Sequence, residues 1–167
     1  WQVATIQLDF NQPRSFGLAC TNEKGEKEPI LMIHCAIMGS IERFMSVIIE
    51  HFAGNFPFWL APEQVALLPV GEKHREACRA LEAKLGALGV RAWLDESDES
   101  VGKKVRGAEK MKIPYSLVLG DKEIPTDGDW NDSVKLAVRV RGTKDAVEMS
   151  LGDFEARLKD ENARKTL

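Results

Sequence analysis

Residues 65–94 have the sequence VALLPVGEKHREACRALEAKLGALGVRAWL, in which the pattern of apolar residues changes twice. The first six residues are almost all apolar, which is typical of a short buried strand. Between residues 73 and 88, apolar residues then recur at helical spacing, at Ala77, Leu81, Leu85 and Leu88. A glycine ends this predicted helix, and the last five residues form another predicted strand. The stretch therefore predicts a strand–helix–strand unit of a largely parallel or mixed sheet.

Downstream, predicted helices and strands continue to alternate. The sequence predicts a basic helix at 101–111, a buried strand at 115–120, an alternating strand at 136–141 and a last helix from Ser150. Ser150 and Asp153 have the spacing of a helix-capping box, and the last helix would bury Leu151, Phe154 and Leu158. We therefore expect residues 64–167 to form an α/β domain with a mixed sheet flanked by helices.

Residues 1–56 follow a different plan, with strands predicted at 3–10, 16–21 and 30–37 and a helix between Ser40 and Gly54. Short turns join these strands, which favours an antiparallel sheet. The first strand alternates, so one face is expected to be polar and the other to pack through Ala4, Ile6, Leu8 and Phe10. Residues 57–63 contain two prolines and are expected to be a stiff linker.

The bulk composition excludes several classes of protein. Of the 167 residues, 44% are hydrophobic and 29% are charged, which is ordinary for a globular protein. The net charge of −3 means that nucleic acid would have to bind a local basic face. The three cysteines form no CxxC pair, which fits a reducing, cytoplasmic compartment. No apolar run is long enough for a membrane span, and a start at Trp1 without Met indicates that the natural protein continues upstream.

Several blocks of the sequence resemble the threonyl-tRNA synthetase family. In the family's order they are WQVATIQLDFNQP (1–13), IHCAIMGSIERF (33–44), FAGNFPFWLAPEQV (52–65), KMKIPYSLVLGDKE (110–123) and VRVRGTKD (138–145). The resemblance implies that residues 1–56 end a class II catalytic domain, with its third signature motif in the helix after Ser40. It implies that residues 64–167 are an anticodon-binding domain. The implied activity is the ATP-dependent attachment of L-threonine to tRNA-Thr, with magnesium accompanying ATP, in a homodimeric protein.

The resemblance assigns roles to six residues of the first part. Arg43 corresponds to the motif 3 arginine that stacks on the adenine of ATP, and a guanidinium plane suits both that ring and nearby phosphate. His34 corresponds to one of three zinc ligands, with the other two expected upstream, and this zinc would select the threonine hydroxyl. The threonine and ATP pockets would also be lined by Gln2, Thr5, Gln7 and Ser40. From the residues alone, plainer interpretations are a surface ion pair, a core histidine, exposed strand residues and a helix cap.

In the second part, the resemblance points to anticodon recognition. Glu123 and Arg139 correspond to residues that contact anticodon bases, and Arg106 and Lys112 lie at positions that are usually basic in the family. Carboxylates and guanidinium groups suit the edges of unstacked RNA bases, while lysine and arginine contact phosphates. Further cations of the same two regions are Lys103, Lys104, Lys110, Arg141 and Lys144. A solvated charged helix face is the alternative explanation for these cations.

Three features depart from the family pattern. Cys35 replaces the usual arginine after His34 and points to the opposite face of the strand. The acidic stretch DESDESVG (95–102) replaces a usually basic segment and makes Asp98 a doubtful anticodon contact, because carboxylates repel phosphate. Residues 125–135 insert an acidic, turn-rich loop. In that loop Trp130 is expected to pack over the sheet, with stacking on a base as the alternative.

These departures leave a second hypothesis open, a non-catalytic, synthetase-like RNA-binding or accessory module. The retained His34, Ser40 and Arg43 favour the enzyme. Most of the class II apparatus, including the second signature motif, is absent from these 167 residues. We therefore expect residues 1–167 alone to be inactive in forming threonyl-adenylate.

Overall fold

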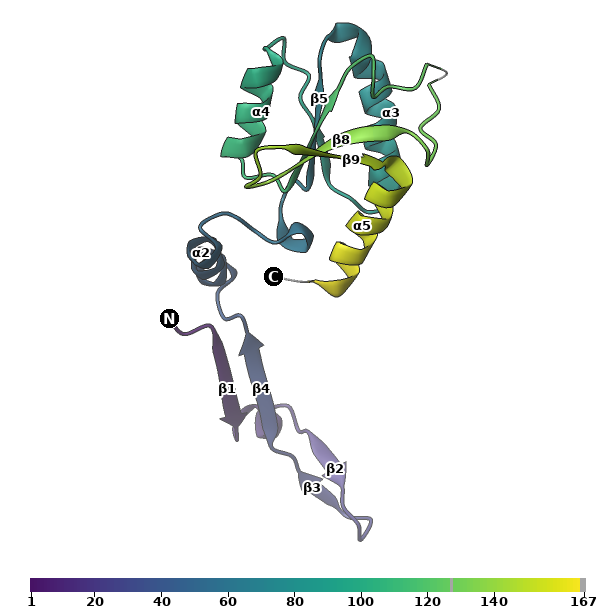
Figure 1. The fold of residues 1–167 in the computed structure, drawn as a ribbon. Helices are drawn as coiled ribbons and strands as arrows, with labels where there is room; N and C mark the ends of the chain where they lie inside the picture. Colours follow the sequence, from purple (N-terminus) through teal and green to yellow (C-terminus); the bar gives the residue numbers. More distant parts are fainter. Residues whose placement is uncertain (127, 166–167) are drawn as a thin grey trace. The chain divides into compact units, whose positions relative to one another are not determined.

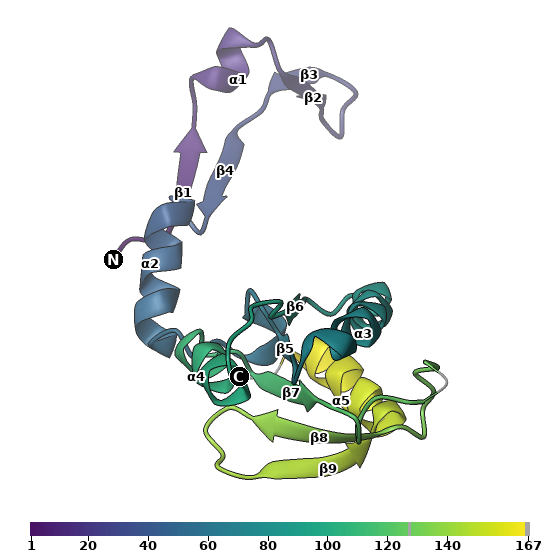
Figure 2. The same ribbon diagram turned by 90° about the horizontal axis from the view of Figure 1, so that it is seen from above.

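The structure is a computed structural model that describes residues 1–126 and 128–165. The chain divides into two compact units, Trp1–Phe52 and Ala53–Leu167, and each is described by itself (Figures 1 and 2). None of the described helices is both long enough and apolar enough to cross a membrane.

The first unit consists of β1 (Ala4–Asp9), α1 (Gln12–Ser15), β2 (Ala19–Thr21), β3 (Lys27–Pro29), β4 (Met32–Ile37) and α2 (Ile41–Phe52). β1 pairs with β4 in antiparallel orientation, and β2 and β3 form an antiparallel hairpin. The antiparallel pairing predicted from the short turns is therefore confirmed.

The polar stretch after Thr21 is the predicted turn, in which the Asn22 side chain accepts two backbone N–H groups. Two elements of this unit differ from the prediction. The short strand β3, at the end of this polar stretch, is not predicted by the sequence. The strand predicted from Phe16 begins only at Ala19, since the short helix α1 precedes it. The Asp9 side chain accepts the N–H groups at the start of that helix at 2.9 Å. Local side-chain bonds of this kind are weak signals in a sequence.

The apolar face of the β1–β4 pair is not packed within this unit. Ile6 lies opposite Cys35 and Leu8 opposite Ile33, so the two strands share one apolar face as their alternation predicts. However, Ile6 is 76% exposed and Ile33 is 69% exposed. α2 buries none of its side chains either, despite its broad apolar stripe. The expected packing of this face is therefore not provided by residues 1–52.

The second unit is the α/β domain that the sequence predicts. Its described elements are the 3₁₀ helix η1 (Phe58–Leu60), β5 (Val65–Pro69), the 3₁₀ helix η2 (Glu72–His74), α3 (Arg75–Ala87), β6 (Ala92–Leu94), α4 (Val101–Lys110), β7 (Tyr115–Leu119), β8 (Lys135–Val140), β9 (Ala146–Ser150) and α5 (Leu151–Arg164). The strands form one mixed sheet in the order β6-β5-β7-β8-β9. β5 is parallel to β6 and β7, whereas β8 is antiparallel to β7 and β9.

Helices cover the two faces of this sheet unequally (Figure 2). α3 and α5 pack on one face, where the main core contains Leu67, Leu81 and Phe154. α4 packs on the other face, against Ala66 and Leu68. Because β5 is buried on both faces, its sequence is a continuous apolar run without alternation. α4 packs mainly against β5 and β7, so the same face of β8 and β9 remains open beside it.

Residues 57–63, predicted as a linker, are attached to the second unit. Phe58 is buried in the main core. The Arg91 guanidinium donates hydrogen bonds to the carbonyl groups of Trp59 and Ala61 at 2.9 and 2.8 Å. This segment is therefore fixed by its contacts with the domain and not only by its prolines.

The last strand and the last helix meet at Ser150. β9 is an edge strand that the sequence does not predict, because its side chains are mostly exposed and alternate weakly. The predicted helix cap is confirmed, since the Ser150 hydroxyl oxygen accepts the backbone N–H of Asp153 at 3.1 Å. The predicted inward residues of α5 are all buried, namely Leu151, Phe154 and Leu158.

Candidate functional site

The polar face of the β1–β4 pair brings together residues predicted to bind threonine and zinc. The strand register places Gln7 directly opposite His34, and Thr5 lies on the same face of β1. Asp9 shares this face, with its Oδ2 atom 3.7 Å from His34 Nε2. Backbone N–H groups of the following turn donate to the other oxygen of Asp9 and hold the pKa of this carboxyl below its usual value.

Gln2, Ser40 and Arg43 join this polar face. The Gln2 side-chain amide donates to Thr5 Oγ1 at 2.6 Å, and the Arg43 guanidinium donates to the Gln2 carbonyl at 3.2 Å. The Ser40 hydroxyl oxygen accepts the backbone N–H of Arg43 at 3.4 Å, at the start of α2. That hydroxyl donates to Glu42 and lowers its pKa. The six residues predicted for the catalytic side therefore lie close together, although they come from three separate segments.

The described residues do not form a complete metal site around His34. Within residues 1–126 and 128–165, no three His, Cys, Asp or Glu side chains gather in a way that could hold a metal ion. Cys35 points to the apolar face, where it lies opposite Ile6. A protein zinc site needs three or four ligands, and the described residues offer no such set around His34.

A groove in the second unit brings Glu123 and Arg139 together. It has a volume of about 550 Å³ and lies beside α4 on the open face of the sheet. Its lining comes from α4, three strands and the turn after β7, through Val101, Gly102, Val105, Val118, Glu123, Ala137, Arg139 and Ala146. The two side chains predicted to contact anticodon bases thus share one concave surface with an apolar floor.

Glu123 is positioned by a tight turn after β7. The Gly120 N–H donates to Glu123 Oε2 at 3.0 Å, which fixes one end of the carboxylate. A Cβ atom at Gly120 would lie only 3.1 Å from the Val70 side chain, so this turn favours glycine. Arg139 approaches the groove from β8, and its Nη2 donates to the Lys144 carbonyl at 3.3 Å. A carboxylate and a guanidinium are therefore presented on one surface by two different strand ends.

Asp121 ties this turn to the segment before α3. Its Oδ1 atom lies 2.6 Å from Lys73 Nζ and 3.0 Å from Nε2 of the buried His74 ring. His74 Nδ1 accepts the Gly71 N–H at 3.1 Å, which places the ring proton on Nε2, where it is donated to Asp121. The hydrogen bonds from Lys73 and His74 lower the pKa of Asp121.

We expect acid to weaken the second unit partly through Asp121. Because its folded-state pKa is lowered, its contribution to stability is complete above the ordinary carboxyl pKa of 3.8 and is lost as the pH falls through the lower folded value. In urea titrations from about pH 7 to about pH 2, Asp121→Asn should therefore lose less stability than the unchanged chain. Identical pH dependence of the two proteins would argue against this role.

The other two predicted RNA-binding residues have different surroundings. Arg106 is exposed on α4. Lys112 follows the helix with a φ of 58°, and its ammonium group donates to the Ala53 carbonyl. The Arg141 guanidinium donates to the carbonyl groups of Lys112 and Phe56 at 2.7 and 2.8 Å. Lys112 and Arg141 therefore anchor the beginning of the second unit, whereas Arg106 is open to solvent.

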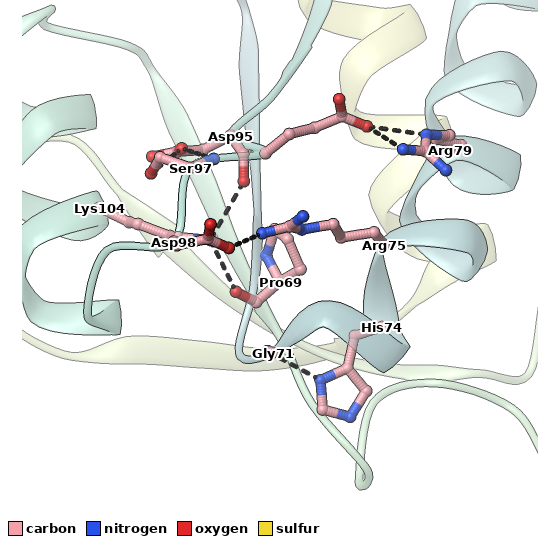
Figure 3. A network of polar contacts seen from close by, with 10 residues as sticks. Pro69, Gly71, His74, Arg75, Arg79, Asp95, Ser97, Asp98 and Lys104 are labelled. Carbon is pink, nitrogen blue, oxygen red and sulfur yellow. Dashed lines mark hydrogen bonds and ion pairs between the residues drawn. The ribbon is translucent and has the colours of Figure 1, made fainter.

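Lys104 belongs to the domain interior and not to the basic surface predicted for α4. It is 4% exposed, and its Nζ donates to the carbonyl groups of Pro69 at 3.1 Å and Asp95 at 3.2 Å (Figure 3). A buried ammonium requires such partners because the loss of hydration is costly. Lys104, which the sequence grouped with the other cations of this helix, is therefore not part of its exposed basic face. The exposed cations of α4 are Lys103, Arg106 and Lys110.

The acidic stretch after β6 is paired with cations of α3. Arg75 pairs with Asp98, and Arg79 Nη2 lies 2.7 Å from Glu96 Oε1 (Figure 3). Exposed pairs of this kind stabilise a fold by about 1 kcal/mol at most. Their main consequence is electrostatic, because each carboxylate is compensated by a neighbouring cation. Asp98, already doubtful as an anticodon contact, is thus engaged with Arg75.

The inserted loop at 125–135 is anchored to α3. Trp130 is 6% exposed in the main core, and its Nε1 donates to the Ala77 carbonyl at 2.9 Å. Lys84 of the same helix donates to the Trp130 carbonyl. The prediction that Trp130 packs is therefore confirmed, and it does so on the face opposite α4. Asp127 of this loop lies outside the described residues.

Comparison with known proteins supports the resemblance over both units. A family model described as an anticodon binding domain matches residues 64–161, and a model of the tRNA synthetase class II core domain (G, H, P, S and T) matches residues 1–52. The threonine-tRNA ligases of Desulforamulus reducens and Symbiobacterium thermophilum are each 44% identical to this chain over all 167 residues. The chain spans 25% of the length of each of these relatives.

Solved structures support the fold. The RNA binding domain of threonyl-tRNA synthetase from Cryptosporidium parvum matches with a TM-score of 0.79 and 32% identity, over 96% of this chain and 39% of that one. A threonyl-tRNA synthetase from Aeropyrum pernix matches with a TM-score of 0.60 and 29% identity, over 98% of this chain and 39% of that one. Because the anticodon-binding model covers more than half of the sequence, this chain belongs to the anticodon-binding domain family, in the form that threonyl-tRNA synthetases carry.

Proposed function

We propose that this chain is part of a threonyl-tRNA synthetase, which attaches L-threonine to tRNA-Thr with ATP and magnesium, and that its second unit binds the anticodon loop. The observation that carries the proposal is the groove beside α4, where Glu123 and Arg139 share an apolar floor. An unstacked base needs an apolar surface for its ring and polar groups for its edge, and this groove provides both.

Recognition in the groove would combine base contacts with phosphate contacts. Glu123 accepts hydrogen bonds and Arg139 donates them, so the pair complements a base edge that has both donors and acceptors. The exposed Arg106 and Lys110 of α4 would contact the RNA backbone and orient the loop. The net charge of −3 confines this attraction to one face. Lys112, which anchors Ala53, would act on RNA only indirectly.

The first unit would supply part of the site that activates threonine. Arg43 would stack on adenine and meet the phosphates of ATP, with Gln2 and Ser40 beside it. Thr5 and Gln7 would line the threonine pocket. His34 would provide one zinc ligand, and the remaining ligands would come from another part of the protein. Catalysis in such a site depends on positioning and charge stabilisation, and no protein nucleophile is required.

The alternative, a non-catalytic RNA-binding module, loses part of its support. It drew on the acidic residues after β6, which would repel RNA. In the structure Asp98 and Glu96 are paired with Arg75 and Arg79, so their charges are compensated within the domain. We also expect the complete protein to be a cytoplasmic homodimer, as the family resemblance implies.

Anticodon binding can be tested with RNA stem-loops of the tRNA-Thr anticodon arm, measured by filter binding across a salt series. We expect affinity to fall steeply with salt, because cations of α4 release counterions from phosphates. Substituting anticodon bases at constant salt should weaken binding by about tenfold or more. An affinity that ignores the anticodon sequence would remove Glu123 and Arg139 from base recognition.

A further inference from the structure

We propose that a second pocket next to the groove receives one unstacked RNA base, and that Ser116 and Glu109 recognise it. The pocket has a volume of about 190 Å³ and lies between α4, β7 and the end of β8. This is smaller than pockets for drug-sized ligands, so it suits a single planar ring system. The inference rests on the proposed binding of RNA and adds a subsite and two residues to it.

Ser116 is the strongest indication of a ligand in this pocket. It is a hydroxyl residue within the buried strand β7, and it is only 7% exposed. Among the described residues, its hydroxyl has no hydrogen-bond partner, although it lines the pocket. The hydroxyl oxygen is not one of the fully buried polar atoms without a partner, so it is open to the pocket. A bound group that donates or accepts a hydrogen bond would satisfy it.

The walls of the pocket complement a nucleobase. Val105 and Ile113 provide apolar surface for a ring. Glu109 lines the pocket from α4 and can only accept hydrogen bonds, which favours a base that presents an amino or imino donor. A phosphate fits poorly, because Glu109 would repel it and the Arg141 guanidinium is engaged with backbone carbonyl groups.

Arg139 links this pocket to the groove that holds Glu123. The sheet register places Arg139 directly opposite Ser116, so their side chains share one face. Arg139 and Val105 line both cavities. Two nucleotides of one unstacked loop could therefore occupy neighbouring sites, with the Arg139 guanidinium between their bases. This arrangement makes Arg139 a contact for both bases and Ser116 a contact for one.

The test measures binding of the anticodon stem-loop RNA to the unchanged chain and to Ser116→Val, which fills the pocket and removes the hydroxyl. Each loop nucleotide is made abasic in turn. We expect Ser116→Val to weaken binding of the intact RNA by about tenfold. At one loop position, the abasic RNA should bind equally to both proteins, because the missing base is the one that the pocket receives. At the other positions, the loss of affinity caused by Ser116→Val and the loss caused by the missing base should add.

Two further variants separate recognition from folding. Ser116→Ala removes only a hydroxyl that is open to the pocket, so its thermal stability should stay close to that of the unchanged chain while RNA affinity falls. Glu109→Gln should weaken RNA binding through the base at the same loop position. Glu76 is an exposed glutamate of α3 on the other face of the sheet, so Glu76→Gln should bind RNA like the unchanged chain.

The outcomes distinguish this pocket from the proposed function. If the unchanged chain discriminates among anticodons but Ser116→Val, Ser116→Ala and Glu109→Gln all bind like it, the pocket assignment is overturned and anticodon binding stands. The pocket assignment is also overturned if, at every loop position, the loss of RNA affinity in each protein variant adds to the loss caused by the abasic substitution. If the unchanged chain does not bind the RNA at all, the proposed function itself fails.

Discussion

Replacing Arg139 by alanine is expected to weaken binding of tRNA-Thr by about 10- to 100-fold and to abolish discrimination among anticodon bases. Its guanidinium lines both cavities of the open sheet face, so one truncation removes contacts to two bases. Within the described part of the chain, its hydrogen bond to the Lys144 carbonyl is long, at 3.3 Å, and contributes little to the fold. The variant should therefore remain folded while it loses RNA affinity.

Two variants make this result specific. Arg139→Lys keeps the charge but not the planar guanidinium, so it should retain most salt-dependent affinity and lose base discrimination. Arg164→Ala removes the same charge from α5, where Arg164 Nε pairs with Asp160 Oδ1 at 2.7 Å on the other face of the sheet. It should bind tRNA like the unchanged chain. A similar loss in Arg139→Ala and Arg164→Ala would show that only net charge matters.

The second large effect is expected on stability, from Lys104→Met. The methionine keeps the apolar stem but leaves the carbonyl groups of Pro69 and Asp95 without their shared donor. Unpaired buried polar groups and the loss of a charge-assisted bond together should lower the free energy of unfolding by about 2–4 kcal/mol. We also expect the segment that begins at Asp95 to become more mobile, because Lys104 joins it to the end of β5.

The matched control is the neighbouring residue. Lys103→Met removes an exposed ammonium whose Nζ pairs with Glu99 at 2.5 Å, four residues earlier. Such a pair is worth about 0.3–0.5 kcal/mol. Urea unfolding followed by tryptophan fluorescence would compare the two variants. Equal destabilisation would mean that the buried ammonium of Lys104 is not a structural link.

Much of the candidate site on the first unit could be predicted from the sequence, because it depends on strand alternation. Thr5 and Gln7 share a face by the period of two, and the resemblance placed His34 in the same pocket. What the sequence does not show is the register that sets Gln7 opposite His34. Register depends on which strand pairs with which, and turn geometry such as the Asn22 hairpin contributes to that choice.

The basic helix shows where prediction from charge alone goes wrong. Lys104 lies three residues after Val101 and four before Ala108, which is the inward spacing of the helix, so the signal for burial was present. Charge nevertheless suggested a surface residue, because buried lysines are rare. Only the folded domain brings the carbonyl groups of Pro69 and Asp95 to the end of its side chain.

By itself, the sequence determined the strand–helix–strand order, the helix cap at Ser150 and the family to which the chain belongs. These depend on local periodicity, on short-range hydrogen bonds and on ordered motifs, all of which are present in the linear chain. The tertiary structure decided that Glu123 and Arg139 share a groove, that Lys104 is internal and that Ser116 faces a pocket. The physical reason is that desolvation and long-range pairing depend on which side chains are in contact in the folded domain. The spacing of apolar residues along the sequence does not predict those contacts.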